Sequence, residues 1–258
     1  MGDEQRDMPV TSADGTRLAV RRRGRGPAVV LVHGSAGGLD SWDPVVPHLD
    51  EDYELWVYAR RGYQPSDPGR RSKTYADDVS DLEAVIAATG GPAHVVGGSY
   101  GAVVTLHAAL RLETMNKIAL FEPPLFTSGT DALKPYRDLL DAGDVPGAIR
   151  LFAERVARVP AEILAAFDGQ GDPAEAAGSL HDLEAMAADR PDLGRWADVS
   201  LPTLIIQGGE TWAPMPATMD ALAEAMPKAT RVVLPGQSHF ATHTAPQQFA
   251  AEVRRFLA

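Results

Sequence analysis

The chain has 258 residues, which fits one large α/β domain with an ample buried core, and its apolar content of 45% is ordinary for a globular protein. It carries 35 acidic and 24 basic side chains, and the resulting net charge of −11 argues against nucleic acid and against anionic membrane surfaces as partners. The sequence has no cysteine, which excludes disulfides, thiolate metal sites and a cysteine nucleophile.

The N-terminal segment predicts a hairpin followed by a buried strand. Residues 1–10 are acidic and have no apolar core, so we expect no signal peptide, and no apolar run in the sequence is long enough to cross a bilayer. We therefore expect a cytoplasmic protein. The Asp14–Gly15 turn between two extended segments is typical of a β-hairpin. Residues 28–32 then form a continuous apolar run, which is typical of a strand covered on both faces.

Apolar runs and amphipathic segments alternate along the rest of the chain. We expect strands at residues 53–58, 93–96, 117–121, 203–206 and 231–234, and helices at 75–89, 102–111, 217–226 and 247–257. This alternation predicts an α/β fold on a doubly wound, mostly parallel sheet.

The alternation is interrupted between residues 123 and 196, where no strand is expected. Four short amphipathic helices are expected there instead, at residues 131–142, 145–156, 160–167 and 173–188. An insertion between two strands at this point predicts a helical cap over the strand ends. The predicted division is therefore a core of residues 1–122 and 197–258 and a helical cap of residues 123–196.

The sequence Gly97-Gly98-Ser99-Tyr100-Gly101 lies between an expected strand and an expected helix. A G-x-S-x-G pattern in this context is typical of a tight turn that exposes a nucleophilic serine. Side chains two residues before and two residues after the serine would clash with neighbouring backbone, so glycine is needed at both positions. We expect a strained backbone at Ser99, the candidate nucleophile.

A histidine follows the last expected strand. From the loop after residues 231–234, His239 can reach a nucleophile turn at the strand ends. A neutral imidazole there can take the serine proton and later return it to the leaving group. His243, four residues on, raises the alternative of a metal site, but no third ligand is nearby in the sequence. We therefore expect no metal and no cofactor.

A glycine-rich loop, His33-Gly34-Ser35-Ala36-Gly37-Gly38, follows the first central strand. Such a loop lets backbone N–H groups point into a cleft. The N–H groups of Ser35 and Tyr100 are the candidate oxyanion hole, and the start of the helix after Ser99 adds a favourable dipole.

Together these segments resemble the α/β-hydrolase superfamily over nearly the whole chain. The resemblance rests on the His33–Gly34 loop, on residues 58–66, on Gly97–Gly101 and on His239. It implies a catalytic triad with an oxyanion hole, and it carries the nucleophile, base and oxyanion roles to Ser99, His239, Ser35 and Tyr100. It also implies that the inserted helices are the family's cap domain, which shapes the substrate pocket.

Two stretches depart from the family pattern. Residues 59–66 lack the Asp and the second Gly of D-x-R-G-x-G-x-S, so we expect an altered pocket wall there. Thr211 stands where the family usually has the triad Asp, so another carboxylate must orient His239. We favour Glu122, which ends the strand next to the nucleophile strand in the family's sheet order and resembles the Glu acid of zearalenone lactonases and some haloalkane dehalogenases. Glu210 is the alternative.

A serine nucleophile favours an acyl-enzyme intermediate. The resemblance implies hydrolysis of a carboxylic ester or lactone of a small, largely apolar substrate, with Gly34, Phe126, Trp212 and Phe240 as candidate substrate-binding residues. The same triad also serves C–C bond hydrolysis, perhydrolysis and non-hydrolytic reactions of secondary metabolism, and a non-catalytic small-molecule receptor is a further alternative on this fold. The expected partner is a small molecule, and the sequence leaves the oligomeric state open.

Overall fold

Eight strands form one sheet in the computed structural model, which describes residues 6–68, 73–126, 128–164 and 171–258. The strands lie in the order β1-β2-β4-β3-β5-β6-β7-β8. The hairpin of β1 (Arg6–Thr11) and β2 (Arg17–Gly24) is antiparallel, and β2 runs antiparallel to β4 (Glu54–Tyr58). All other pairs are parallel and join β4 to β3 (Ala28–Val32), β5 (Ala93–Gly98), β6 (Met115–Phe121), β7 (Thr203–Gly208) and β8 (Ala229–Leu234). The predicted hairpin and mostly parallel sheet are confirmed.

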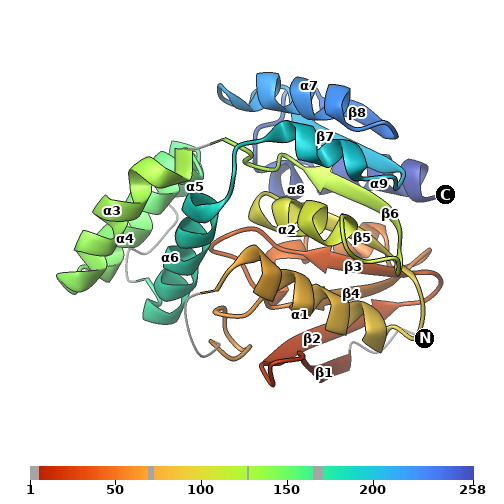
Figure 1. The fold of residues 1–258 in the computed structure, drawn as a ribbon, viewed down its shortest axis with the longest axis horizontal. Coiled ribbons are helices and arrows are strands. Elements are labelled where there is room, and N and C mark those ends of the chain that lie inside the picture. Colours follow the sequence, from red (N-terminus) through yellow and green to blue (C-terminus); the bar gives the residue numbers. More distant parts are fainter. Residues whose placement is uncertain (1–5, 69–72, 127, 165–170) are drawn as a thin grey trace.

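Helices cover both faces of this sheet (Figure 1). One face packs against α1 (Tyr75–Ala88), α2 (Tyr100–Ala109) and α7 (Met215–Ala225), and the other against η1 (Leu39–Trp42), η2 (Val46–His48) and α9 (Pro246–Leu257). Strand β3 shows why both faces need cover, because Val30 and Val32 belong to one apolar cluster while Val29 and Leu31 belong to the other. Successive side chains of a strand point to opposite faces, so an uninterrupted apolar strand requires a layer on each side.

A separate layer of helices is inserted between β6 and β7 and lies beside the sheet at the left of Figure 1. It contains α3 (Ser128–Asp141), α4 (Val145–Leu151), η3 (Phe152–Val156), α5 (Ala161–Leu164) and α6 (Pro173–Ala188). These inserted helices enclose a small apolar cluster of their own, made of Ala132, Tyr136, Ala148, Phe152 and Leu183. The last part of the helix predicted at residues 160–167 lies outside the described residues.

Short helices are the elements that the sequence pattern did not predict. Besides η1 and η2, they are η4 (Leu193–Asp198) before β7 and α8 (Ala241–Thr244) after the β8 loop. Each has six residues or fewer, too short for a helical period to be visible in the sequence.

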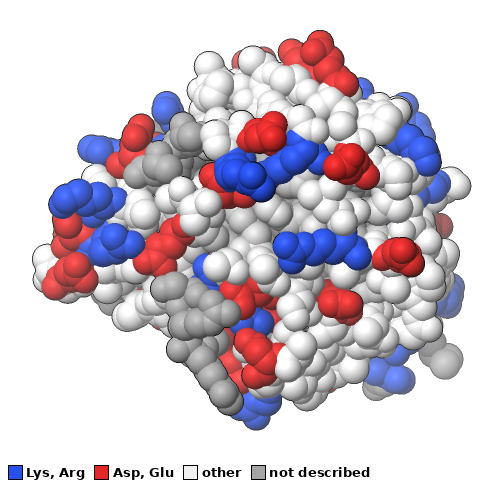
Figure 2. Space-filling view, in the orientation of Figure 1, with Lys and Arg blue, Asp and Glu red and all other residues white. Residues whose placement is uncertain are grey.

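Charged side chains of both signs are interspersed over the face shown in Figure 2. On the inserted helices, Lys134 pairs with Asp138 and Arg137 pairs with Glu184. Among the described residues, none of the helices combines the length and the apolar character that a bilayer crossing requires.

Candidate active site

Ser99 occupies a sharp turn between β5 and α2. Its backbone φ is 53° and its ψ is −122°, a combination that costs free energy for a residue with a side chain and that recurs at functional sites. A Cβ atom at Gly97 would lie 2.5 Å from the Gly101 carbonyl oxygen, and one at Gly101 would lie 2.3 Å from the Val32 carbonyl oxygen. Only glycine fits at either position, as the spacing in the sequence predicts.

His239 lies on the loop after β8 and is held by a buried carboxylate. Its Nδ1–H donates to Glu122 Oε2 over 2.6 Å, since the carboxylate oxygen can only accept. In the neutral imidazole this contact places the proton on Nδ1, which leaves Nε2 to accept a proton. Phe121 stacks on the imidazole with ring centroids 5.7 Å apart, and Trp212 contacts it edge-on at 5.1 Å.

Glu122 directly follows β6 and is fully buried, with a positive φ of 44°. Its Oε1 accepts a hydrogen bond from the backbone N–H of Gly208 at 2.8 Å, and its Oε2 accepts a second bond from Thr211 Oγ1 at 3.2 Å. Three donors thus fix both oxygens of one carboxylate. Thr211, which stands where the family's Asp was expected, serves the replacement acid as a hydrogen-bond donor.

The alternative acid, Glu210, lies elsewhere. Its side chain is exposed, and its backbone N–H donates to the carbonyl oxygen of Gln237 at 2.8 Å. Of the two candidate carboxylates, the structure brings Glu122 to His239.

The two candidate oxyanion donors flank Ser99. Tyr100 is the first residue of α2, so its N–H is one of the four that a helix leaves without an intrahelical partner. Ser35 follows Gly34, where a Cβ atom would lie 3.1 Å from the Ser99 Cβ. The next residue, Ala36, has a φ of 52°, so this loop shares the backbone strain found at Ser99 and at Glu122.

A cavity of about 340 Å³ opens above Ser99. It is lined by Ser99, His239, Ser35 and Tyr100, and by the four candidate substrate-binding residues, Gly34, Phe126, Trp212 and Phe240. The inserted helices and the loops beside them contribute a mainly apolar wall of Phe152, Val156, Ala157, Val159 and Met186. Three further lining residues were not predicted from the sequence: Met186 of the inserted helices, and Met215 and Trp42 of the core. Apolar residues at helical spacing usually indicate packing between helices, so they do not by themselves predict a pocket.

The departing stretch of residues 59–66 is packed into the molecule. Arg61 makes two hydrogen bonds to Asp81, of 2.7 and 2.6 Å, and Ser66 Oγ donates to the carbonyl oxygen of Ala59 at 2.6 Å. The neighbouring Arg60 is fully buried behind the Gly34 loop. Within the described residues, no group of three or more His, Asp or Glu side chains is arranged to hold a metal ion.

Comparison with known proteins agrees with this fold. The model of the alpha/beta hydrolase family matches residues 29–252, which is most of the chain. The chain belongs to the alpha/beta hydrolase family. Among solved structures, an alpha/beta hydrolase from Sphaerobacter thermophilus is 30% identical, with a TM-score of 0.83 over 97% of this chain and 100% of the other.

Two further relatives of this alpha/beta hydrolase have named activities. A 2-(acetamidomethylene)succinate hydrolase from Mesorhizobium japonicum is 26% identical over 260 residues, covering 93% of this chain and 91% of that protein. The structure of a thermophilic esterase from Thermogutta terrifontis shares the fold, with a TM-score of 0.83 at 22% identity over 98% of both chains. Hydrolysis is thus the activity that these names have in common.

Proposed function

We propose that this alpha/beta hydrolase is a serine hydrolase that cleaves a carboxylic ester or lactone of a small, largely apolar substrate. The observation that carries the proposal is the 2.6 Å bond from His239 to the buried Glu122, beside a cavity that both His239 and Ser99 line. A nucleophile, a base oriented by an acid, and backbone donors at one cavity are the parts that acyl transfer needs.

The chemistry follows from the free nitrogen of His239. Nε2 takes the proton of Ser99 Oγ as this oxygen attacks the carbonyl carbon, and Glu122 stabilises the imidazolium that forms. The N–H groups of Ser35 and Tyr100 bind the oxyanion of the tetrahedral intermediate. Collapse of the intermediate releases the alcohol with the proton from His239, and water then hydrolyses the acyl-enzyme by the same steps.

The lining of the cavity supports the substrate class. Its walls are mostly aromatic and aliphatic, and they include Phe126, Phe152 and Trp212. Apolar walls with few polar groups favour a neutral, apolar acyl or alkyl group. The inserted helices supply one of these walls, which supports a role as the cap that selects the substrate.

Active-site labelling tests the proposal directly. We expect a fluorophosphonate probe to label the wild-type protein and not Ser99→Ala, and we expect a panel of short p-nitrophenyl esters and lactones to be hydrolysed by the wild type alone. Labelling of Ser99→Ala to the same extent, or wild-type inertness toward both probe and panel, would refute the proposal.

A further inference from the structure

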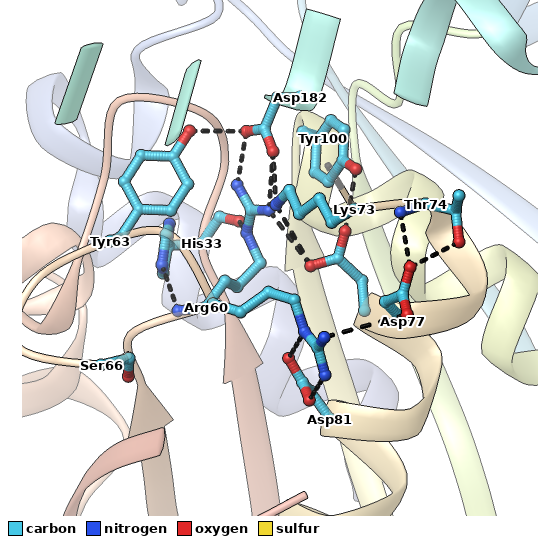
Figure 3. A network of polar contacts seen from close by, with 12 residues as sticks. His33, Arg60, Tyr63, Ser66, Lys73, Thr74, Asp77, Asp81, Tyr100 and Asp182 are labelled. Atoms are coloured by element: carbon cyan, nitrogen blue, oxygen red, sulfur yellow. Dashed lines mark hydrogen bonds and ion pairs between the residues drawn. The ribbon is translucent and has the colours of Figure 1, made fainter. Parts of the chain in front are cut away.

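Four buried charged side chains form a cluster next to the Gly34–Ser35 loop, and Figure 3 shows three of them, Arg60, Lys73 and Asp182. Arg60 and Lys73 carry positive charges, and Asp78 and Asp182 carry negative charges. All four side chains are at most 2% exposed, so this cluster is balanced in charge and shielded from water. Removing one member would leave an uncompensated charge in a medium of low dielectric constant, which is costly.

Asp182 ties this cluster to the inserted helices, because it lies on α6. The guanidinium of Arg60, which lies just after β4, donates to both carboxylate oxygens of Asp182, at 3.1 and 2.7 Å. Lys73 Nζ lies 2.5 Å from one of these oxygens. Tyr63 Oη–H donates to Asp182 Oδ2 at 2.6 Å. Burial alone would raise the pKa of Asp182, but the charges of Arg60 and Lys73 outweigh it and hold the pKa well below its usual range.

The other side of Arg60 holds the loop that contains the candidate oxyanion donor. Its Nε donates to the carbonyl oxygen of His33 at 3.0 Å, and its Nη2 donates to the carbonyl oxygen of Gly34 at 3.0 Å. The Arg60 backbone N–H also donates to His33 Nε2 at 2.9 Å, so the proton of His33 sits on Nδ1, which donates to the Gly34 carbonyl oxygen at 2.6 Å. Burial, with Arg60 nearby, lowers the pKa of His33 and keeps it neutral.

The Gly34 carbonyl belongs to the same peptide group as the Ser35 N–H. In a trans peptide the C=O and N–H bonds point in opposite directions, so fixing the carbonyl also fixes the direction of the N–H. Two donors bind this carbonyl oxygen, the cationic guanidinium of Arg60 and the imidazole of His33. Hydrogen bonds in a chain polarise one another, so the same contacts make the Ser35 N–H a stronger donor.

We propose that Arg60 and Asp182 are positioning residues for the oxyanion hole, with Asp182 of the inserted helices orienting Arg60 and Arg60 orienting the Gly34–Ser35 peptide. This inference rests on the proposed serine hydrolase function. It makes the placement of α6 a condition for full transition-state stabilisation. The Tyr63 hydroxyl adds a second link, since it accepts a hydrogen bond from the backbone N–H of Ala36 at 3.2 Å while donating to Asp182.

Kinetics of Asp182→Asn and Arg60→Gln test this role with the best p-nitrophenyl ester of the panel. We expect kcat to fall roughly 10- to 100-fold in each, because a misaligned donor costs somewhat less than the ~10²- to 10³-fold of a deleted one. KM should change less than about threefold, since the oxyanion forms only in the transition state. A boronic acid, which forms a tetrahedral adduct, should bind more weakly by the same factor as kcat, while the non-hydrolysable ether analogue of the substrate keeps its affinity.

Asp81→Asn is the matched control. Asp81 is also a buried partner of an arginine, with hydrogen bonds of 2.6 and 2.7 Å to Arg61, and it lies outside the cluster next to the Gly34–Ser35 loop. We expect this variant to lose stability and keep kcat. If Asp182→Asn loses stability and keeps its kcat and boronic-acid affinity as Asp81→Asn does, the cluster is merely structural and the inference is wrong.

Two further measurements keep the test decisive. Tyr63→Phe removes one hydroxyl and no charge, so it tests the connection between Asp182 and the Ala36 loop even if Asp182→Asn or Arg60→Gln does not fold. We expect a roughly 3- to 10-fold loss of kcat. An unchanged kcat in Tyr63→Phe would also count against the inference. The proposed function is judged separately, because wild-type activity and its loss in Ser99→Ala do not depend on Arg60 or Asp182.

Discussion

Replacing Glu122 with Gln separates the two candidate triad acids. The substitution keeps the size and shape of the side chain and removes its charge. In the wild type both carboxylate oxygens accept hydrogen bonds, from Gly208 N–H at 2.8 Å on one side and from His239 Nδ1–H at 2.6 Å on the other. A glutamine must turn its NH₂ group toward one of these donors.

Both orientations are unfavourable. With the NH₂ group toward Gly208, two donors face each other in a fully buried place, where an unsatisfied group costs about 1–3 kcal/mol, and the charge that stabilises the imidazolium is gone. With the NH₂ group toward His239, the imidazole must move its proton to Nε2, the nitrogen that has to accept the serine proton. Loss of the correct tautomer in other Ser-His-Asp enzymes costs about 10⁴ in kcat. We therefore expect a 10³- to 10⁴-fold loss here, about 4 to 5.5 kcal/mol of transition-state stabilisation.

The assay is steady-state hydrolysis of a short p-nitrophenyl ester, with circular dichroism to confirm folding. The exposed Glu210→Gln is the control, and we expect its kcat and KM to lie within about twofold of wild type, as is usual for a surface substitution away from the site. Retention of more than a tenth of the wild-type kcat in Glu122→Gln, or an equal loss in Glu210→Gln, would refute the assignment.

Three other substitutions test the turn, the cavity and the buried charges. Gly101→Ala places a methyl group 2.3 Å from the Val32 carbonyl oxygen, so we expect a loss of about 1–3 kcal/mol in urea unfolding together with a drop in kcat, whereas Gly91→Ala, which meets no atom within 4 Å, should change neither. Trp212→Ala removes an aromatic wall of the cavity, and KM for an apolar ester should rise roughly tenfold; an unchanged KM would remove this side chain from the substrate pocket. Because the folded-state pKa of Asp182 is depressed, its stabilisation is complete above the unfolded pKa of about 3.9 and is lost as the pH falls further. The difference in unfolding free energy between wild type and Asp182→Asn should thus stay constant from about pH 5 to 8 and shrink below about pH 4, and a difference that grows on acidification would contradict this.

The sheet could be predicted from the sequence because its strands are long apolar runs between turn signals. Residues 28–32 are the clearest case, since a strand buried on both faces has no polar position to interrupt it. The helix α2 begins two residues before its predicted start at residue 102, because the nucleophile turn itself supplies its first residues. The 3₁₀ helices and α8 could not be predicted, because a single turn has no periodicity.

For the site, the sequence pointed to residues whose role is local. Gly97 and Gly101 are recognisable because the steric demand of the turn acts within a few residues. Arg60 and Asp182 were missed because they are 122 positions apart and meet only when α6 packs against the loop after β4. The single local signal was the absence of the family's Asp at position 59, from which we expected an altered pocket wall. That expectation was wrong in its place, because residues 59–66 are packed into the molecule and do not line the cavity.

Glu122, the proposed triad acid directly after β6, changes what the end of β7 and the loop after it have to supply. In the common arrangement that loop must present a carboxylate at one fixed point, whereas here Gly208 at the end of β7 and Thr211 in the loop supply only hydrogen-bond donors, an N–H and a hydroxyl. The exposed side chain of Glu210 is then free to vary, whereas Trp212 lines the cavity and also contacts the imidazole of His239 edge-on at 5.1 Å. For protein engineering, Trp212 is the position of this loop at which a library would change substrate preference, and its replacements must still pack against the imidazole.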